Sequence, residues 1–200
     1  YQSAIEVLEG LETFKEDYIS HIRRQECTGI TGQKIPCVTL CPAHVDIPGY
    51  IAHVQEGNYD KAINLIRRDN PLPTACAMIC EHPCEERCRR NLIDTSLNIR
   101  GVKKYAVDQI AADKVEVPRA NPATGKKVAV IGGGPSGMTA AYYLSLMGHK
   151  VTVYEAKERL GGMLMYGIPN YRFPKDRLDE DMNAILSTGN IEVKYGVNVG

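Results

Sequence analysis

The sequence of 200 residues lacks tryptophan and contains only two phenylalanines, so its eleven tyrosines must supply most of the aromatic packing. Basic and acidic side chains balance at 24 each, and no net field draws the chain to nucleic acid or to an acidic membrane surface. No apolar run approaches the ~20 residues that are needed to cross a bilayer. We therefore predict neither a nucleic-acid partner nor a membrane-spanning segment.

An initiator methionine is also missing, and the first residues lack the basic and apolar regions of a secretory signal. We expect the chain to be a piece of a longer protein. Its seven cysteines are an odd number, which disfavours a closed disulfide framework. Together with the glycine-rich loop at residues 132–137, of a kind found mainly inside cells, this favours a reducing, cytoplasmic location.

The last four cysteines are spaced by four residues each. On one continuous helix the outer two would lie about 18 Å apart along the axis, which is too far for one cluster. Pro83 also disfavours a continuous helix and suits the first turn of a new one. We predict two half-sites, with Cys76 and Cys80 at the end of one segment and Cys84 and Cys88 at the start of another. All seven cysteines lie in the first half of the chain: Cys27, Cys37, Cys41, Cys76, Cys80, Cys84 and Cys88.

The upstream pair Cys37 and Cys41, followed by Pro42, forms the C-x3-C-P ending of bacterial ferredoxin-type sequences. In those sequences the last cysteine ligates a different cluster from its neighbours, which favours two [4Fe–4S] clusters here. Two clusters need eight ligands, and only seven cysteines exist, so one ligand is not a cysteine or one cluster is absent. Zinc is an alternative, although the C-x2-C pairs that structural zinc prefers are missing. We expect His82 to be a capping or surface residue rather than a ligand.

Hydrophobic periodicity predicts an all-α domain over residues 1–115 and an α/β domain over residues 127–200. A linker of prolines and small residues at 116–126 separates the two. Residues 29–42 are expected to form a loop. Helices are expected at 3–24, from 46 to about 57, at 59–68, at 98–113 and at 138–147, and strands at 128–131, at 151–154 and from 191.

The glycine-rich loop Gly132-Gly133-Gly134-Pro135-Ser136-Gly137 lies between the first strand and the helix that follows, which is the context that a G-x-G-x-x-G fingerprint requires. Gly132 permits a tight turn, Gly134 lets the backbone approach a pyrophosphate, and Gly137 allows close packing of helix and strand. The N-terminus of the helix presents free N–H groups to the anion. The strand order predicts a parallel pair with a right-handed crossover.

Glu155 follows the second strand and is placed to accept hydrogen bonds from a ribose, which disfavours NADP at this loop. The spacing does not distinguish FAD from NAD. A second glycine pair, Gly161-Gly162, would let the backbone pass close to a long, extended cofactor, although the pair could also form an ordinary turn.

Taken together, these segments resemble a known family. Cys37-x3-Cys41-Pro42 through Asp46-Ile47-Pro48, then Asn70-Pro71-Leu72-Pro73 and Cys76-x3-Cys80, resemble the N-terminal iron–sulfur domain of the glutamate synthase small (beta) subunit family. The N-terminal part of dihydropyrimidine dehydrogenase is similar. The glycine loop, residues 161–169 and Tyr171-Arg172-Phe173-Pro174-Lys175 resemble the FAD segment of the family. The resemblance covers nearly the whole chain.

This resemblance implies a multidomain protein in which an all-α iron–sulfur domain is followed by a truncated, Rossmann-like FAD-binding domain. It implies one or two [4Fe–4S] clusters, FAD, and NADPH bound in a later domain that is missing here. One ligand set would include Cys27, Cys37 and Cys88, and the other Cys41, Cys80 and Cys84, whereas relatives need not use Cys76. Glu155 would hold the FAD ribose, and the flavin would lie by Gly161, Gly162, Leu164, Gly167 and Ile168.

The chain departs from the family pattern in three ways. Upstream of Cys37 it has only Cys27 in place of a close C-x2-C pair, and Lys103 stands where dihydropyrimidine dehydrogenase offers a glutamine. It also ends at Gly200 without a second glycine fingerprint for NADPH, so we expect the 200 residues alone to be inactive with NADPH and to bind FAD weakly.

The leading hypothesis is therefore part of an NAD(P)H-dependent oxidoreductase that passes electrons from NADPH through FAD and the clusters to a large catalytic subunit or another redox partner. Two alternatives stay open at this stage: a non-enzymatic iron–sulfur docking module, and a zinc-stabilised NAD-binding protein. No catalytic acid, base or nucleophile can be identified.

Overall fold

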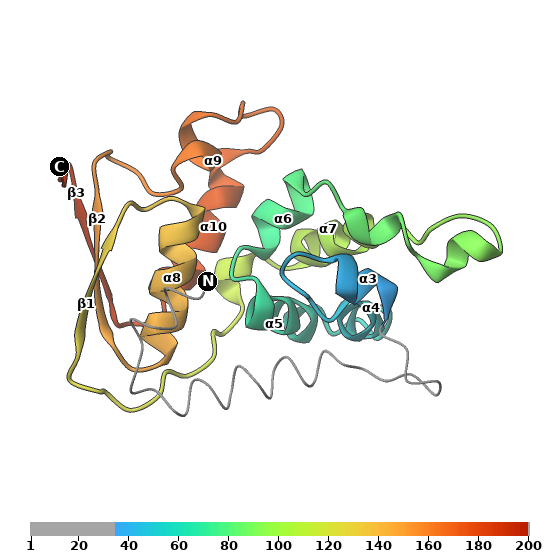
Figure 1. The fold of residues 1–200 in the computed structure, drawn as a ribbon, viewed down its shortest axis with the longest axis horizontal. Coiled ribbons are helices and arrows are strands. Elements are labelled where there is room, and N and C mark those ends of the chain that lie inside the picture. The colour runs from blue at the N-terminus through green and yellow to red at the C-terminus, as the bar shows by residue number, and fades with distance from the viewer. Residues whose placement is uncertain (1–34, 200) are drawn as a thin grey trace.

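The computed structural model describes residues 35–199, so Cys27 and the helix expected at 3–24 lie outside the described residues. Figure 1 shows a helical part that is joined to a small sheet with helices packed on one of its faces. In the described residues, no helix is both long and apolar enough to span a membrane.

The helical part is built from short helices that begin at prolines or capping residues. The Asp46 side chain accepts a hydrogen bond from the Gly49 N–H at 3.0 Å and caps the next helix, as the sequence predicts. The elements in chain order are α3 (Pro36–Leu40), α4 (Ile47–Gln55), α5 (Tyr59–Asp69), α6 (Pro73–Ile79), η1 (Pro83–Glu85), η2 (Arg89–Leu92), α7 (Ile99–Gln109) and η3 (Ala112–Lys114).

Two expectations about this part were wrong. A loop was expected over residues 29–42, but Pro36 starts the short helix α3 within that range. The helix expected at 98–113 ends at Gln109, where Ile110 is extended. The cause is the buried side chain of Arg67. Its guanidinium donates to the carbonyl oxygens of Ala112 and Val115 and keeps residues 110–115 from continuing α7.

The sheet has three parallel strands in the order β1-β2-β3, and the predicted parallel pair of β1 and β2 is confirmed. In the described part of the chain β1 pairs with β2 alone, and Ile131 at the end of β1 is 68% exposed. The elements are β1 (Lys127–Ile131), α8 (Pro135–Leu146), β2 (Lys150–Glu155), α9 (Met163–Tyr166), α10 (Lys175–Leu186) and β3 (Ile191–Tyr195).

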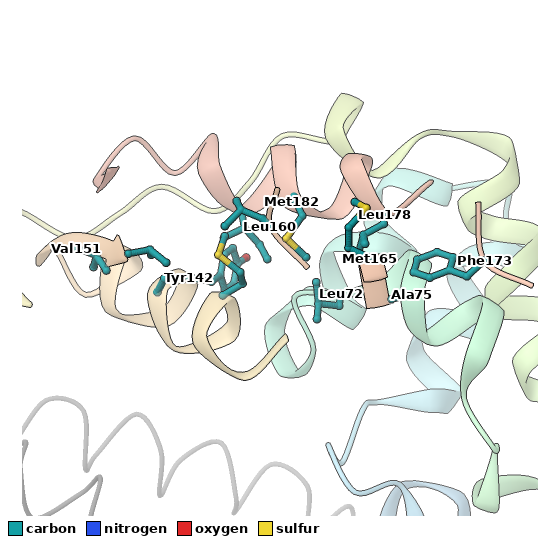
Figure 2. Close-up of a cluster of buried hydrophobic side chains, with 13 residues drawn as sticks. Leu72, Ala75, Tyr142, Val151, Leu160, Met165, Phe173, Leu178 and Met182 are labelled. Carbon is teal, nitrogen blue, oxygen red and sulfur yellow. The ribbon is translucent and has the colours of Figure 1, made fainter. Parts of the chain in front are cut away.

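Residues 116–126 contain neither helix nor strand and lie against the end of α8, where the Asn121 N–H donates to the Leu146 carbonyl at 2.8 Å. The helical part and the sheet part nevertheless share one hydrophobic core. Leu72 and Ala75 from the start of α6 belong to the same buried cluster as Leu178 of α10. Figure 2 shows these side chains together with Met165 and Phe173. The two halves of the chain are thus packed against each other.

Candidate functional site

Three thiols from three different elements line one small cavity of about 30 Å³. Cys41 is the C-cap of α3, Cys80 is the C-cap of α6, and Cys84 lies in η1. The helix ends therefore bring together cysteines that are up to 43 positions apart in the sequence. This is the set that the resemblance assigns to one cluster.

A tight turn places Cys80 and Cys84 on the same cavity. His82 has a φ of 46°, in the left-handed region, and its backbone N–H donates to the Cys80 Sγ at 3.3 Å. Pro83 then starts η1, as the sequence predicts for a new helical turn. The four-residue spacing therefore does not form one continuous helix, because the chain turns at His82.

A second group contains Cys37 in α3 and Cys88, the N-cap of η2. Burial raises the pKa of the Cys37 thiol, and negative charge on Cys88 and Cys41 raises it further. Cys37 is thus an electrostatic neighbour of Cys88, which the resemblance places in its ligand set, and of Cys41, which the resemblance places in the other set. The third member of that set, Cys27, lies outside the described residues.

Cys76 lies apart from the cavity lining, within α6. Its Sγ accepts a hydrogen bond from the Asn70 Nδ2 at 2.9 Å. Burial raises the pKa of the Cys76 thiol, and the positive charge of Lys103 opposes that rise. Its position outside the cavity lining sets Cys76 apart from the three cavity thiols.

The donor chemistry of these residues is that of an iron–sulfur cluster site. All six described cysteines are free thiols, the soft ligands that iron–sulfur clusters use. Within residues 35–199 no three His, Cys, Asp or Glu side chains are close enough to hold one ion. A cluster offers a separate iron to each thiolate, so its ligands lie farther apart than those of one zinc ion.

Helix α7 adds two basic residues to the cavity lining, Arg100 and Lys103, one turn apart. The Arg100 Nη1 donates to the Cys80 carbonyl at 2.9 Å. Lys103 is only 8% exposed, and its Nζ lies 5.9 Å from the centre of the Tyr50 ring. Sequence reasoning singled out Lys103 but missed Arg100, because a lone arginine on a helix carries no local signal.

The glycine loop forms the tight turn that the fingerprint predicts. Gly132 has a φ of 93°, and a Cβ on Gly137 would lie 1.9 Å from the Gly132 carbonyl oxygen. Pro135 is the first residue of α8 and Ser136 is exposed beside it, so α8 starts three residues before the expected helix. The first N–H groups of a helix have no partner within it and are available to an anion.

Glu155 ends β2 and is buried beside the loop, with 7% exposure. Its Oε2 accepts a hydrogen bond from the Gly133 N–H at 2.7 Å, and its Oε1 accepts one from the Lys157 N–H at 2.8 Å. In this structure the carboxylate therefore fixes the glycine loop. Each oxygen keeps further acceptor capacity, so the predicted ribose contact stays a prediction.

The second glycine pair packs directly on the first loop. The Gly161 N–H donates to the Gly133 carbonyl at 2.8 Å, and a Cβ on Gly162 would lie 2.9 Å from the Gly134 Cα. Both residues have positive φ, at 108° and 51°. The following turn is fixed by the Lys175 Nζ, which donates to two backbone carbonyls. The expected flavin neighbours here are Leu164 and Ile168, which accept these bonds and are half-buried, and Gly167, which is exposed.

Asp181 of α10 links the two candidate sites, and sequence reasoning missed it. Its carboxylate is fully buried and accepts hydrogen bonds from the N–H groups of Thr74 and Ala75 in the first turn of α6. Burial raises the pKa of Asp181 to about 7, which these hydrogen bonds and Arg67 oppose. The available signal was an acidic residue inside an apolar stripe formed by Leu178, Met182 and Ile185.

Comparison with known proteins gives two family matches. Residues 11–115 match the family described as dihydropyrimidine dehydrogenase domain II, 4Fe-4S cluster. Residues 130–194 match the family described as NAD(P)-binding Rossmann-like domain.

Three curated relatives are similar over most of this chain. The NADPH-Fe(3+) oxidoreductase subunit beta of Geobacter sulfurreducens is 40% identical over 99% of this chain and 30% of its own length. The NADP(+)-dependent formate dehydrogenase subunit beta of Moorella thermoacetica is 39% identical over 82% of this chain and 27% of its own length. The glutamate synthase [NADPH] small chain of Mycobacterium tuberculosis is 34% identical over 92% of this chain and 38% of its own length.

The chain thus spans between about a quarter and two fifths of the length of these relatives. The cavity of free thiols lies in the part that matches the iron–sulfur family, and the glycine loop lies in the part that matches the Rossmann-like family. The chain therefore belongs to the dihydropyrimidine dehydrogenase domain II, 4Fe-4S cluster family, with a Rossmann-like NAD(P)-binding region after that domain, among oxidoreductases that include glutamate synthase small chains.

Proposed function

We propose that this chain is the electron-entry part of an NAD(P)H oxidoreductase, in which electrons pass from NADPH through FAD to iron–sulfur clusters and on to a partner subunit. The observation that carries this proposal is the contact of Asp181 with α6. These hydrogen bonds join α6, whose C-cap is Cys80, to α10 in the part of the chain that holds the glycine loop. Two redox sites in one packed body are what electron transfer between them needs.

FAD is proposed for the glycine loop because the second glycine pair lies against it. The Gly161 N–H bond to the Gly133 carbonyl gives the site two adjacent backbone segments free of side chains. A dinucleotide that extends from the loop past Gly162 toward Leu164 would use both segments. Glu155 would bind its ribose, and the N-terminus of α8 its pyrophosphate.

For the clusters, we propose Cys41, Cys80 and Cys84 as ligands of one, and Cys37 and Cys88, with Cys27, as ligands of the other. The cavity shared by the first three thiols supports the first set. The second set rests on the resemblance, since the charges that raise the pKa of Cys37 are those of both Cys88 and Cys41. Cys76 would not be a ligand, because it lies within α6 and outside the lining of that cavity.

FAD and the clusters, when bound, would supply the conversion of a two-electron hydride into single electrons. The residues of the chain would bind these cofactors and set their orientation. Glu155 and the glycine loop would hold the nucleotide, and the buried Cys84 with the half-buried Cys41 and Cys80 would hold the cluster. The partner would be a large catalytic subunit or another redox protein, and we propose a reducing, cytoplasmic location.

Anaerobic reconstitution with iron, sulfide and FAD tests the proposal. We expect iron, acid-labile sulfide and flavin to be bound to the same purified protein. Iron and sulfide without flavin would support a docking module instead, and a colourless protein that carries zinc would contradict the proposal.

A further inference from the structure

We propose that the positive charge of Lys103 raises the reduction potential of the cluster bound by Cys41, Cys80 and Cys84, and that Lys103 is not itself a ligand. This inference rests on the function proposed above. The fold places the Lys103 side chain in the lining of the cavity that the three thiols share.

The position of Lys103 is fixed by its surroundings. The side chain lines the same cavity as the three thiols and is 8% exposed. Its Nζ lies 5.9 Å from the centre of the Tyr50 ring, a favourable cation–π arrangement. Tyr50 cannot move away easily, because it is fully buried and its hydroxyl donates to the Ile99 carbonyl at 3.0 Å.

The neighbouring lysine shows what an ordinary lysine does on this helix. Lys104 points to solvent and forms an ion pair with Asp108, one turn along α7. Lys103 instead is buried, and its side chain lines the same cavity as Cys41, Cys80 and Cys84. A buried cation is costly unless a negative group compensates it. Thiolates that bind iron in this cavity are that negative group.

The charge balance of reduction gives the direction of the effect. One electron from the reduced flavin enters the oxidised cluster, which gains one negative charge and no bond to Lys103. A fixed positive charge nearby stabilises the reduced form more than the oxidised form, so the reduction potential rises. Arg100, whose guanidinium is bound to the Cys80 carbonyl, adds to the same positive side of the cavity.

The test is a redox titration, followed by EPR spectroscopy, of the anaerobically reconstituted protein. We expect Lys103→Met to reduce the ratio of reduced to oxidised cluster at least tenfold at a given potential, which is a shift of about −59 mV for a one-electron couple. Lys103→Arg keeps the charge and should restore the parent potential. Lys104→Met on the same helix is the matched control and should leave the potential unchanged.

Each other outcome has a definite meaning. A parent potential in Lys103→Met at full iron content would overturn the inference and leave the proposed function intact. Loss of iron from Lys103→Met and Lys103→Arg together would also overturn it, because Lys103 would then be a ligand. Lys103→Gln serves as the second uncharged variant if Lys103→Met does not fold. A parent protein that binds no iron would overturn both the inference and the proposed function.

Discussion

The Asp181 Oδ2 accepts a hydrogen bond from the backbone N–H of Ala75 at 2.8 Å, across 106 positions of sequence. The other carboxylate oxygen accepts from the Thr74 N–H at 3.2 Å. Helix α6 has no side-chain cap of its own, so α10 supplies its cap. Because Cys80 is the C-cap of α6, the position of that cavity thiol depends on a residue of α10.

Replacing Asp181 should therefore destabilise the fold. We expect Asp181→Ala to lower the free energy of unfolding by about 2 kcal/mol at pH 6, because two buried N–H groups lose their acceptors. Urea unfolding followed by circular dichroism measures this change. Asp179→Ala, an exposed position on the same helix that pairs with Arg159, is the control and should cost less than ~1 kcal/mol.

Stability should also depend on pH through Asp181. Burial raises its pKa in the folded protein to about 7, above the ~3.9 of an unfolded chain. Between these values the folded protein holds a proton that the unfolded chain has released, so this group makes stability fall as pH rises from about 4 to about 7.

This contribution is isolated by comparing the parent with Asp181→Asn in urea unfolding at pH 5 and pH 8. The parent should lose more stability than the variant over that interval. Equal losses in both proteins would show that Asp181 titrates at its ordinary value.

Two glycines of the nucleotide loop should respond differently to alanine. At Gly134 the nearest protein atom to an added Cβ is 3.8 Å away, so Gly134→Ala should fold normally and weaken FAD binding about tenfold, or ~1.4 kcal/mol. At Gly137 the added Cβ would clash with the Gly132 carbonyl oxygen at 1.9 Å, so both stability and FAD binding should fall. Flavin titration and thermal unfolding measure the two effects, and iron content should stay at the parent level in Gly134→Ala.

Substitution of Cys84 in η1 and of Cys76 in α6 should have different effects on the iron and sulfide content of the protein. Cys84→Ser should lose the iron and sulfide of one cluster, because Cys84 lines the thiol cavity. Cys76→Ser should keep the parent content, because Cys76 lies within α6 and outside the lining of that cavity. Retention of all iron in Cys84→Ser, or its loss in Cys76→Ser, would contradict the proposed ligand set.

The sequence was sufficient for those features whose signals are local. The Asp46 cap, the helix that starts at Tyr59, the parallel strands and the turn at Gly132 all follow from residue types at short spacing, and the structure confirms them. The turn between Cys80 and Cys84 was also predicted, because Pro83 interrupts any helix through them.

Features that depend on distant contacts were not predicted. Helix α6 is short, and its cap comes from Asp181, so its own residues give little sign of it. Helix α7 ends early because the buried guanidinium of Arg67 binds carbonyls beyond it. The pairing of Arg100 with Cys80 and the contact of Lys103 with Tyr50 likewise appear only once the chain is folded.

The open side of β1 has a practical consequence for handling the protein. In the described residues that strand pairs with β2 alone, and Ile131 at its end is largely exposed. An unpaired strand edge with apolar side chains is a template for a further strand, including one from another molecule. We therefore expect this chain, when purified by itself, to self-associate as its concentration rises, and spectroscopic samples should be kept dilute.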